Sequence, residues 1–187
     1  MKNAILVHGC ASKEEFLSEQ FPSSSNSHWL PWLQKQLAIR GIQAQTPEMP
    51  APYEPRYEKW KRVMDRFEVT KGTFLVGHSC GAGFLLRWLG ENKKEGEKLA
   101  LVAPYLDEMR KRQDFLDFTV DATLQDRVGQ IIVVYSTDDT VEGVKQSVDM
   151  ICAALPKAKL HTFSNKGHFT LEDMEKEKFP ELLKLLV

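Results

Sequence analysis

The sequence has few cysteines, no long apolar run and almost no net charge. Its three cysteines, Cys10, Cys80 and Cys152, are an odd number at no metal-ligand spacing, so we expect reduced thiols and no bound metal. The N-terminal apolar run, Ala4–Val7, is too short for a signal peptide, and no stretch approaches the length of a membrane span. A formal net charge of −1 gives no electrostatic reason to expect nucleic acid or a membrane surface as partner. We therefore predict a cytoplasmic protein that acts on a small molecule; the sequence leaves its oligomeric state open.

Short apolar runs alternate with longer amphipathic stretches, and the 187 residues suit one domain over residues 1–187. Apolar runs that are continuous are typical of strands buried on both faces. The sequence therefore predicts an α/β fold, a doubly wound and mostly parallel sheet of about six strands with helices on both faces and no large cap. The predicted strands are Ala4–Val7, Ile42–Thr46, Phe74–Val76, Leu99–Val102, Ile131–Tyr135 and Leu160–Phe163. The predicted helices are Trp29–Arg40, Tyr57–Phe67, Gly83–Glu91, Val144–Ala154 and one near Glu172–Leu186. The segment Pro104–Gly129 has no clear strand and is a candidate for a small lid.

Reactive side chains follow three of the predicted strands. Ser79 follows the third strand, Asp138 and Asp139 follow the fifth, and His168 follows the last. In a parallel sheet of this kind, ligands bind beyond the carboxyl ends of the strands. A serine, a carboxylate and a histidine at one sheet edge are the components of nucleophilic catalysis.

Ser79 lies between two glycines in the stretch FLVGHSCGAG. The residues Thr73–Val76 predict a strand and Ala82–Leu89 a helix, which is the setting that a nucleophile elbow requires. The sharp turn strains the backbone of the serine, and the flanking glycines let the neighbouring chain approach without Cβ clashes. The alternative is an ordinary turn serine that caps the helix. The strand, the helix and the later acid and histidine loops favour the nucleophile.

His168 is the candidate base because its loop follows the final predicted strand and can swing over the serine. His8 and His78 are rivals in sequence. We expect His8 to brace the loop after the first strand by hydrogen bonds, and His78 to point away from the serine beside it in the tight turn. Two other histidines have no supporting context: His28 and His161.

The acid that orients His168 is either Asp138 or Asp139, since both closely follow the same strand. A carboxylate here would fix the imidazole tautomer and stabilise the imidazolium that forms during catalysis. The other aspartate is expected to cap the next turn or helix. We expect an oxyanion hole made by the backbone N–H of Cys80 and one N–H from the loop after the first strand, with Cys10 as the candidate.

Six stretches spread over essentially the whole chain carry a family resemblance: AILVHG, HWLPWLQKQL, MPAP, VGHSCGA, STDD and KGHF. With them the chain resembles the α/β-hydrolase superfamily, and within it the small serine hydrolases of the retinoblastoma-binding protein nine family and their bacterial relatives. The resemblance implies Ser79 as nucleophile, His168 as base and Asp139 as acid. Asp138 stays an alternative, because Thr140-Val141-Glu142 follows the pair where such proteins often carry a proline. The Leu-x-Cys-x-Glu motif for binding retinoblastoma protein is absent, so that partner is not expected.

The predicted activity is carboxylesterase-like hydrolysis of a small acyl substrate, an ester, thioester or amide, without a cofactor. Acyl transfer to an acceptor other than water would use the same groups. The alternative is a non-catalytic protein-interaction module on a hydrolase fold, which has no physical need to retain the complete reactive set. Four aromatic residues are candidates either for the pocket wall or for the core: Trp29, Trp32, Tyr105 and Phe169.

Overall fold

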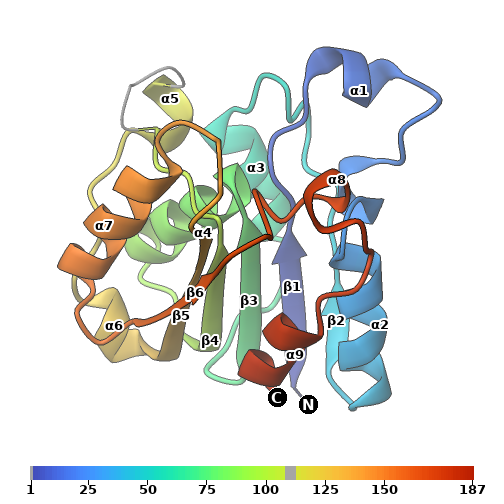
Figure 1. Ribbon diagram of the computed structural model, residues 1–187. Helices are drawn as coiled ribbons and strands as arrows, with labels where there is room; N and C mark the ends of the chain where they lie inside the picture. The colour runs from blue at the N-terminus through green and yellow to red at the C-terminus, as the bar shows by residue number, and fades with distance from the viewer. Residues whose placement is uncertain (1, 108–112) are drawn as a thin grey trace.

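The computed structural model describes residues 2–107 and 113–187, and its strands form a six-stranded sheet (Figure 1). The strand order is β2-β1-β3-β4-β5-β6, and every neighbouring pair is parallel. The prediction of an α/β fold with a parallel sheet of about six strands is confirmed. The strands are β1 (Asn3–Val7), β2 (Gln43–Gln45), β3 (Thr73–His78), β4 (Gly96–Val102), β5 (Val128–Ser136) and β6 (Lys159–Phe163).

Helices cover both faces of the sheet, as Figure 1 shows. One face packs against α2 (Leu30–Ile39) and α9 (Pro180–Leu186), and the other against α3 (Tyr57–Met64), α4 (Cys80–Glu91) and α7 (Val144–Ala154). The side chains of successive strand residues pack into the hydrophobic cores on opposite faces of the sheet, as those of Leu75 and Val76 do in β3. This double burial explains why the strand sequences are continuously apolar. The remaining helices are short: α1 (Lys13–Leu17), η1 (Ser24–Asn26), α5 (Gln113–Leu116), α6 (Leu124–Arg127) and α8 (Leu171–Met174).

The winding direction of the chain reverses between β1 and β3. The chain passes from β1 to β2 at one edge, then returns to β3 on the other side of β1 and continues outward to β6. Loops from neighbouring strands diverge at such a switch point and leave a crevice beyond the carboxyl ends of the strands. The loop after β1 and the turn after β3, which holds Ser79, both lie at this crevice.

The predicted C-terminal helix is wrong in one respect, because the segment forms two helices, α8 and α9. Glu175 ends α8 in a left-handed conformation with φ of 52°, and Pro180 begins α9 at its first turn. Helix α1 was not predicted. Ser12 and Glu15 begin it with a capping box, in which each side chain accepts a hydrogen bond from the backbone N–H of the other.

The candidate lid is shorter than predicted, because β5 begins at Val128 and takes the end of that segment. Helices α5 and α6 occupy part of the remainder, and residues 108–112 lie outside the described part of the chain. None of the helices formed by residues 2–107 and 113–187 combines the length and apolar character needed to cross a bilayer.

Candidate active site

Ser79 lies in the turn between β3 and α4 with a strained backbone. Its φ and ψ are 53° and −122°, a combination that side-chain-bearing residues rarely adopt. Hydrogen bonds fix this conformation. The N–H of Ser79 donates to the carbonyl of Val102 at 2.9 Å, and its carbonyl accepts from Ala82 and Tyr105 at 3.0 and 3.2 Å. The turn therefore has the geometry that the sequence predicts for a nucleophile elbow.

Two glycines allow this turn to pack against its neighbours. A Cβ at Gly77 would lie 2.5 Å from the Cα of Ala82, which is far inside van der Waals contact. A Cβ at Gly81 would overlap the backbone carbonyl of His8 and lie 2.6 Å from that of Val7. The first turn of α4 consequently packs backbone to backbone against the end of β1.

His168 and Asp139 form a close pair at the edge of the sheet. The Nδ1 of His168 lies 2.8 Å from Oδ2 of Asp139, whose side chain is fully buried, while 14% of the His168 side chain is exposed. The other carboxylate oxygen, Oδ1, accepts the N–H of Val141 at 2.9 Å. With Nδ1–H donating to the carboxylate, Nε2 of the neutral imidazole is an acceptor.

Asp138 holds the backbone of the histidine loop instead of the imidazole. Its Oδ1 accepts hydrogen bonds from the Ser136 hydroxyl and, at 3.3 Å each, from the N–H groups of Lys166 and Gly167. The hydrogen bond from Ser136 is the main cause that lowers the pKa of this carboxyl. The two aspartates thus have separate contacts, one to the ring of His168 and one to the loop that carries it.

The backbone of His168 is also fixed from two sides. Its N–H donates to Oδ2 of Asp173 at 2.8 Å, and its carbonyl accepts from Nε2 of His78 at 2.7 Å. His78 is buried, and its ring centroid lies 5.1 Å from that of His168. His78 therefore holds the backbone of the histidine loop, a contact that no local sequence pattern encodes.

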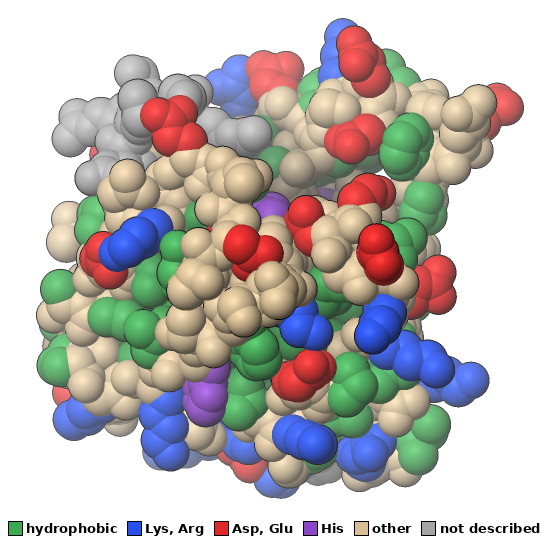
Figure 2. Space-filling model, in the orientation of Figure 1, with side chains coloured by type: hydrophobic (Ala, Val, Ile, Leu, Met, Phe, Trp, Pro, Cys, Tyr) green, Lys and Arg blue, Asp and Glu red, His purple; other side chains and the backbone are tan. Residues whose placement is uncertain are grey.

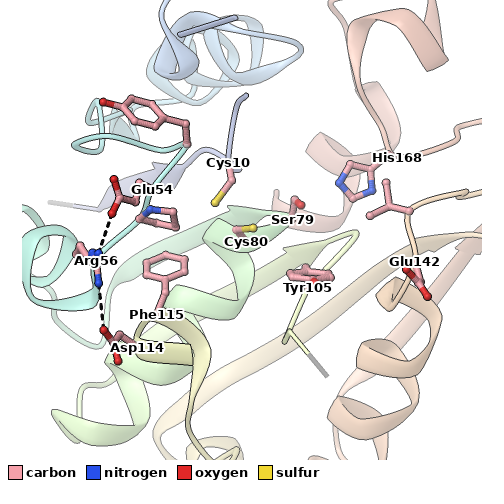
Figure 3. A pocket seen from close by; sticks show the side chains of 13 residues that line it. Cys10, Glu54, Arg56, Ser79, Cys80, Tyr105, Asp114, Phe115, Glu142 and His168 are labelled. Carbon is pink, nitrogen blue, oxygen red and sulfur yellow. Dashed lines mark hydrogen bonds and ion pairs between the residues drawn. The ribbon is translucent and has the colours of Figure 1, made fainter. Parts of the chain in front are cut away.

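Ser79 and His168 line a cavity of about 910 Å³, the larger chamber (Figure 3). Cys10, Cys80, Tyr105 and Phe115 line it near the serine. At its far end, Arg56 forms ion pairs with Glu54 and Asp114 at 2.7 and 3.1 Å. A single continuous cavity therefore joins the serine and histidine to a charged rim.

The loop after β1 lies directly against the serine. A Cβ at Gly9 would be 3.2 Å from the Cβ of Ser79, so the backbone at residues 9 and 10 borders the hydroxyl group. Cys80 begins α4, where backbone N–H groups stabilise negative charge. The structure brings the backbone of both predicted oxyanion residues, Cys10 and Cys80, to the same side of the cavity as Ser79.

The chain matches known proteins over most of its length. A family model described as Serine hydrolase matches residues 18–187. The chain belongs to this serine hydrolase family. Putative hydrolase YdeN of Bacillus subtilis (strain 168) is 30% identical to this chain over 170 residues, which cover 87% of the chain and 88% of YdeN.

Solved structures also resemble this chain. The crystal structure of the ydeN gene product from B. subtilis has a TM-score of 0.82 at 27% identity, over 100% of this chain and 97% of that one. Est1E from Butyrivibrio proteoclasticus, bound to ferulic acid, has a TM-score of 0.71 at 12% identity over 100% of this chain and 86% of its own. At that identity the likeness concerns the fold alone. Together these matches confirm the resemblance to the α/β-hydrolase superfamily.

Of the four aromatic residues that the sequence suggests as pocket wall or core, only Tyr105 lines the larger chamber. Trp29 and Phe169 are fully buried core residues, and Trp32 packs partly buried against the same core. The Trp29 indole N–H donates to the carbonyl of Phe169 at 3.1 Å, so these residues anchor the histidine loop from the core side. Within the described residues, no cluster of His, Cys, Asp or Glu side chains is suited to hold a metal ion.

His8 braces the loop after β1, as the sequence predicts. Its Nε2 accepts the N–H of Met49 at 2.8 Å, so its Nδ1 carries the proton and donates to the carbonyl of Gly9 at 2.7 Å. Burial lowers the pKa of His8, and burial together with the neighbouring His168 and His28 holds the pKa of His78 well below 6.5. Both imidazoles are therefore neutral in the folded chain near pH 7.

The free energy of unfolding is expected to fall as pH is lowered from about 7.5 to about 5.5. Below about pH 6.5 the unfolded chain binds protons at His8 and His78 that the folded chain does not, so stability decreases with falling pH. Each imidazole contributes a slope of up to about 1.4 kcal/mol per pH unit. Urea denaturation across this range measures the slope. His78→Gln keeps a hydrogen-bond donor for the carbonyl of His168 but has no group that titrates, so the slope of unfolding free energy against pH should become smaller. An equal slope in the variant would show that the pKa of His78 is not lowered in the folded chain.

Proposed function

We propose that this serine hydrolase cleaves a carboxylic ester, thioester or amide through an acyl-enzyme on Ser79. The observation that carries the proposal is the 2.8 Å contact between His168 and the buried Asp139, on the wall of the cavity that also holds the strained Ser79. A protein that only binds a partner has no need for a strained serine beside an oriented imidazole. The partner we propose is therefore a small-molecule acyl substrate.

In the proposed reaction, Nε2 of His168 takes the hydroxyl proton of Ser79 as Oγ attacks the substrate carbonyl. Asp139 holds the imidazole in the required tautomer and stabilises the imidazolium. Backbone N–H groups of Cys80 and Cys10 stabilise the negative oxygen of the tetrahedral intermediate. His168 then gives the proton to the leaving group, and water releases the acyl group by the reverse sequence.

This reaction requires only groups of the chain itself and water, so we propose that no cofactor takes part. The larger chamber, at about 910 Å³, lies within the range of about 300–1,000 Å³ that pockets for drug-sized ligands occupy. Substrates larger than a simple acetyl ester are therefore compatible with the site. The thiols of Cys10, Cys80 and Cys152 suit a reducing compartment, and we propose the cytoplasm.

A fluorophosphonate probe, which forms a covalent bond with activated serines, tests the nucleophile. We expect the wild-type chain to be labelled and Ser79→Ala to remain unlabelled, because the alanine lacks the attacking oxygen. A matched control is Ser147→Ala, which removes a buried serine on α7 whose hydroxyl donates to the carbonyl of Gly143, the residue before that helix. Labelling of Ser79→Ala at the wild-type rate, or no labelling of the wild type, would show that the proposal is wrong.

A further inference from the structure

Ser79 also lines a second cavity, the smaller chamber, with a volume of about 400 Å³. The smaller chamber lies toward α1 and α8 and shares Cys10, Ser79 and His168 with the larger chamber. Figure 2 shows a hollow below α1 with histidine atoms at its base. The serine and the histidine therefore stand at the junction of two spaces, and a substrate bound at Ser79 can extend into both.

An aromatic contact joins the linings of the two chambers. Phe16 lines the smaller chamber, Tyr53 lines the larger one, and their ring centroids are 5.3 Å apart. Phe16, Phe21 and Leu171 line the smaller chamber and are 37%, 49% and 37% exposed. Glu15, Gln20 and Glu172 line the same chamber. The chamber therefore offers an apolar chain three large side chains that it would remove from water, beside polar groups that suit an oxygen atom on that chain.

His28 places a hydrogen-bond donor at this second space. Its Nδ1 accepts the N–H of Leu171 at 3.0 Å, and burial lowers its pKa, so the neutral ring carries its proton on Nε2. Among the residues that the structure describes, Nε2 of His28 has no hydrogen-bond partner, and the ring lines the smaller chamber. The rings of His28 and His78 are 5.6 Å apart, and those of His78 and His168 are 5.1 Å apart. His28 and the reacting serine line the same chamber.

We propose that the smaller chamber binds the acyl group of the substrate, an apolar chain that carries an oxygen acceptor for the Nε2–H of His28. This inference rests on the proposed function of Ser79. The larger chamber would then hold the leaving group. The larger chamber has more than twice the volume and is the more open to solvent, and its far end carries the charged groups of Glu54, Arg56 and Asp114.

The order of the two steps supports this assignment. In acylation, the bond from Oγ of Ser79 to the carbonyl carbon forms, and the bond to the leaving oxygen, sulfur or nitrogen breaks as that atom takes the serine proton through His168. The leaving group must then depart and water must enter while the acyl group stays attached. Water then adds its oxygen to the carbonyl carbon and the bond from that carbon to Oγ of Ser79 breaks. His168 takes one proton from the water and passes it to Oγ, and the acyl group leaves as the carboxylic acid. The space that retains the acyl group is best the narrower one, and the space that exchanges the leaving group for water is best the larger and more open one.

Two series of p-nitrophenyl and alkyl esters test the proposal. One varies the acyl chain from acetyl to octanoyl, with and without a keto group at successive carbons; the other varies the alcohol at constant acyl group. Phe21→Ala should lower the ratio of kcat/KM for the octanoyl ester to kcat/KM for the acetyl ester by about tenfold. This is the scale of discrimination that apolar contacts in a pocket provide. His28→Phe should remove the preference for the best keto ester, about fivefold, whereas His28→Gln keeps a donor and should retain it.

Val141→Ala is the matched control, since Val141 lines the larger chamber and is 38% exposed. It should alter discrimination among alcohols but not among acyl groups. The proposal is overturned if the variants of Phe21 and His28 change alcohol discrimination alone, or change nothing while Ser79 is labelled by the fluorophosphonate at the wild-type rate. If wild-type Ser79 is not labelled at all, the proposed function has failed and this inference falls with it.

Discussion

Asp139→Asn is expected to lower kcat for ester hydrolysis by about 10⁴, the scale of such a change in a Ser-His-Asp triad. An amide at this position can donate to Nδ1 of His168 and so favours the tautomer with the proton on Nε2. That tautomer cannot accept the serine proton. The amide also lacks the charge that stabilises the imidazolium. Steady-state hydrolysis of p-nitrophenyl acetate measures the loss.

Asp138→Asn is the matched control for this prediction. Its Oδ1 accepts only from the Ser136 hydroxyl and two backbone N–H groups, and an amide oxygen can do the same. We expect a loss of about tenfold or less, because a neutral acceptor binds the loop less tightly. Equal losses in the two variants, or the larger loss at Asp138, would show that Asp139 is not the acid.

Gly81→Ala is expected to destabilise the fold by about 3 kcal/mol or more, enough to prevent accumulation of a marginally stable chain. The new Cβ would overlap the carbonyl oxygens of Val7 and His8, which belong to the backbone and cannot rotate away. Either α4 or the end of β1 must move, and both moves displace Ser79. Soluble yield and the midpoint of thermal unfolding measure the effect.

Gly72→Ala is the control for the glycine prediction. A Cβ at Gly72 has no neighbour closer than 3.8 Å, the hydroxyl of Thr70, and its φ is not in the left-handed region. We expect a thermal midpoint equal to or slightly above that of the wild type, because alanine restricts the unfolded chain. If both variants unfold at the wild-type temperature, the close contact between α4 and β1 is not required.

The sequence predicts the sheet and the elbow well because both follow from local signals. Continuous apolar runs mark buried parallel strands, and the glycines at 77 and 81 mark the close approach of β3, α4 and β1. Helix α1 also has a local signal, the capping pair Ser12 and Glu15. A helix of five residues is too short to show an apolar periodicity, so the apolar pattern alone does not predict it. The break at Glu175 has no such signal, since a left-handed non-glycine residue follows from packing.

The separate contacts of the aspartates and the role of His28 could not be predicted. Both depend on how the loop at residues 165–170 docks on parts of the chain that are distant in sequence. Asp138 reaches Gly167 and His28 reaches Leu171, across 29 and 143 positions. Residue type and spacing showed that acid and histidine meet at one sheet edge; only tertiary packing determines which oxygen faces which donor.

The bond from Trp29 to Phe169 joins positions that are 140 residues apart. Translation delivers the strained serine long before the imidazole that would activate it, at about 5–20 residues per second. A nascent or truncated chain that stops before residue 168 therefore carries the elbow without its base. In the proposed reaction, such a chain cannot form an acyl-enzyme by this route. Reactivity begins only when the loop that carries His168 has packed against the N-terminal part of the chain at Trp29.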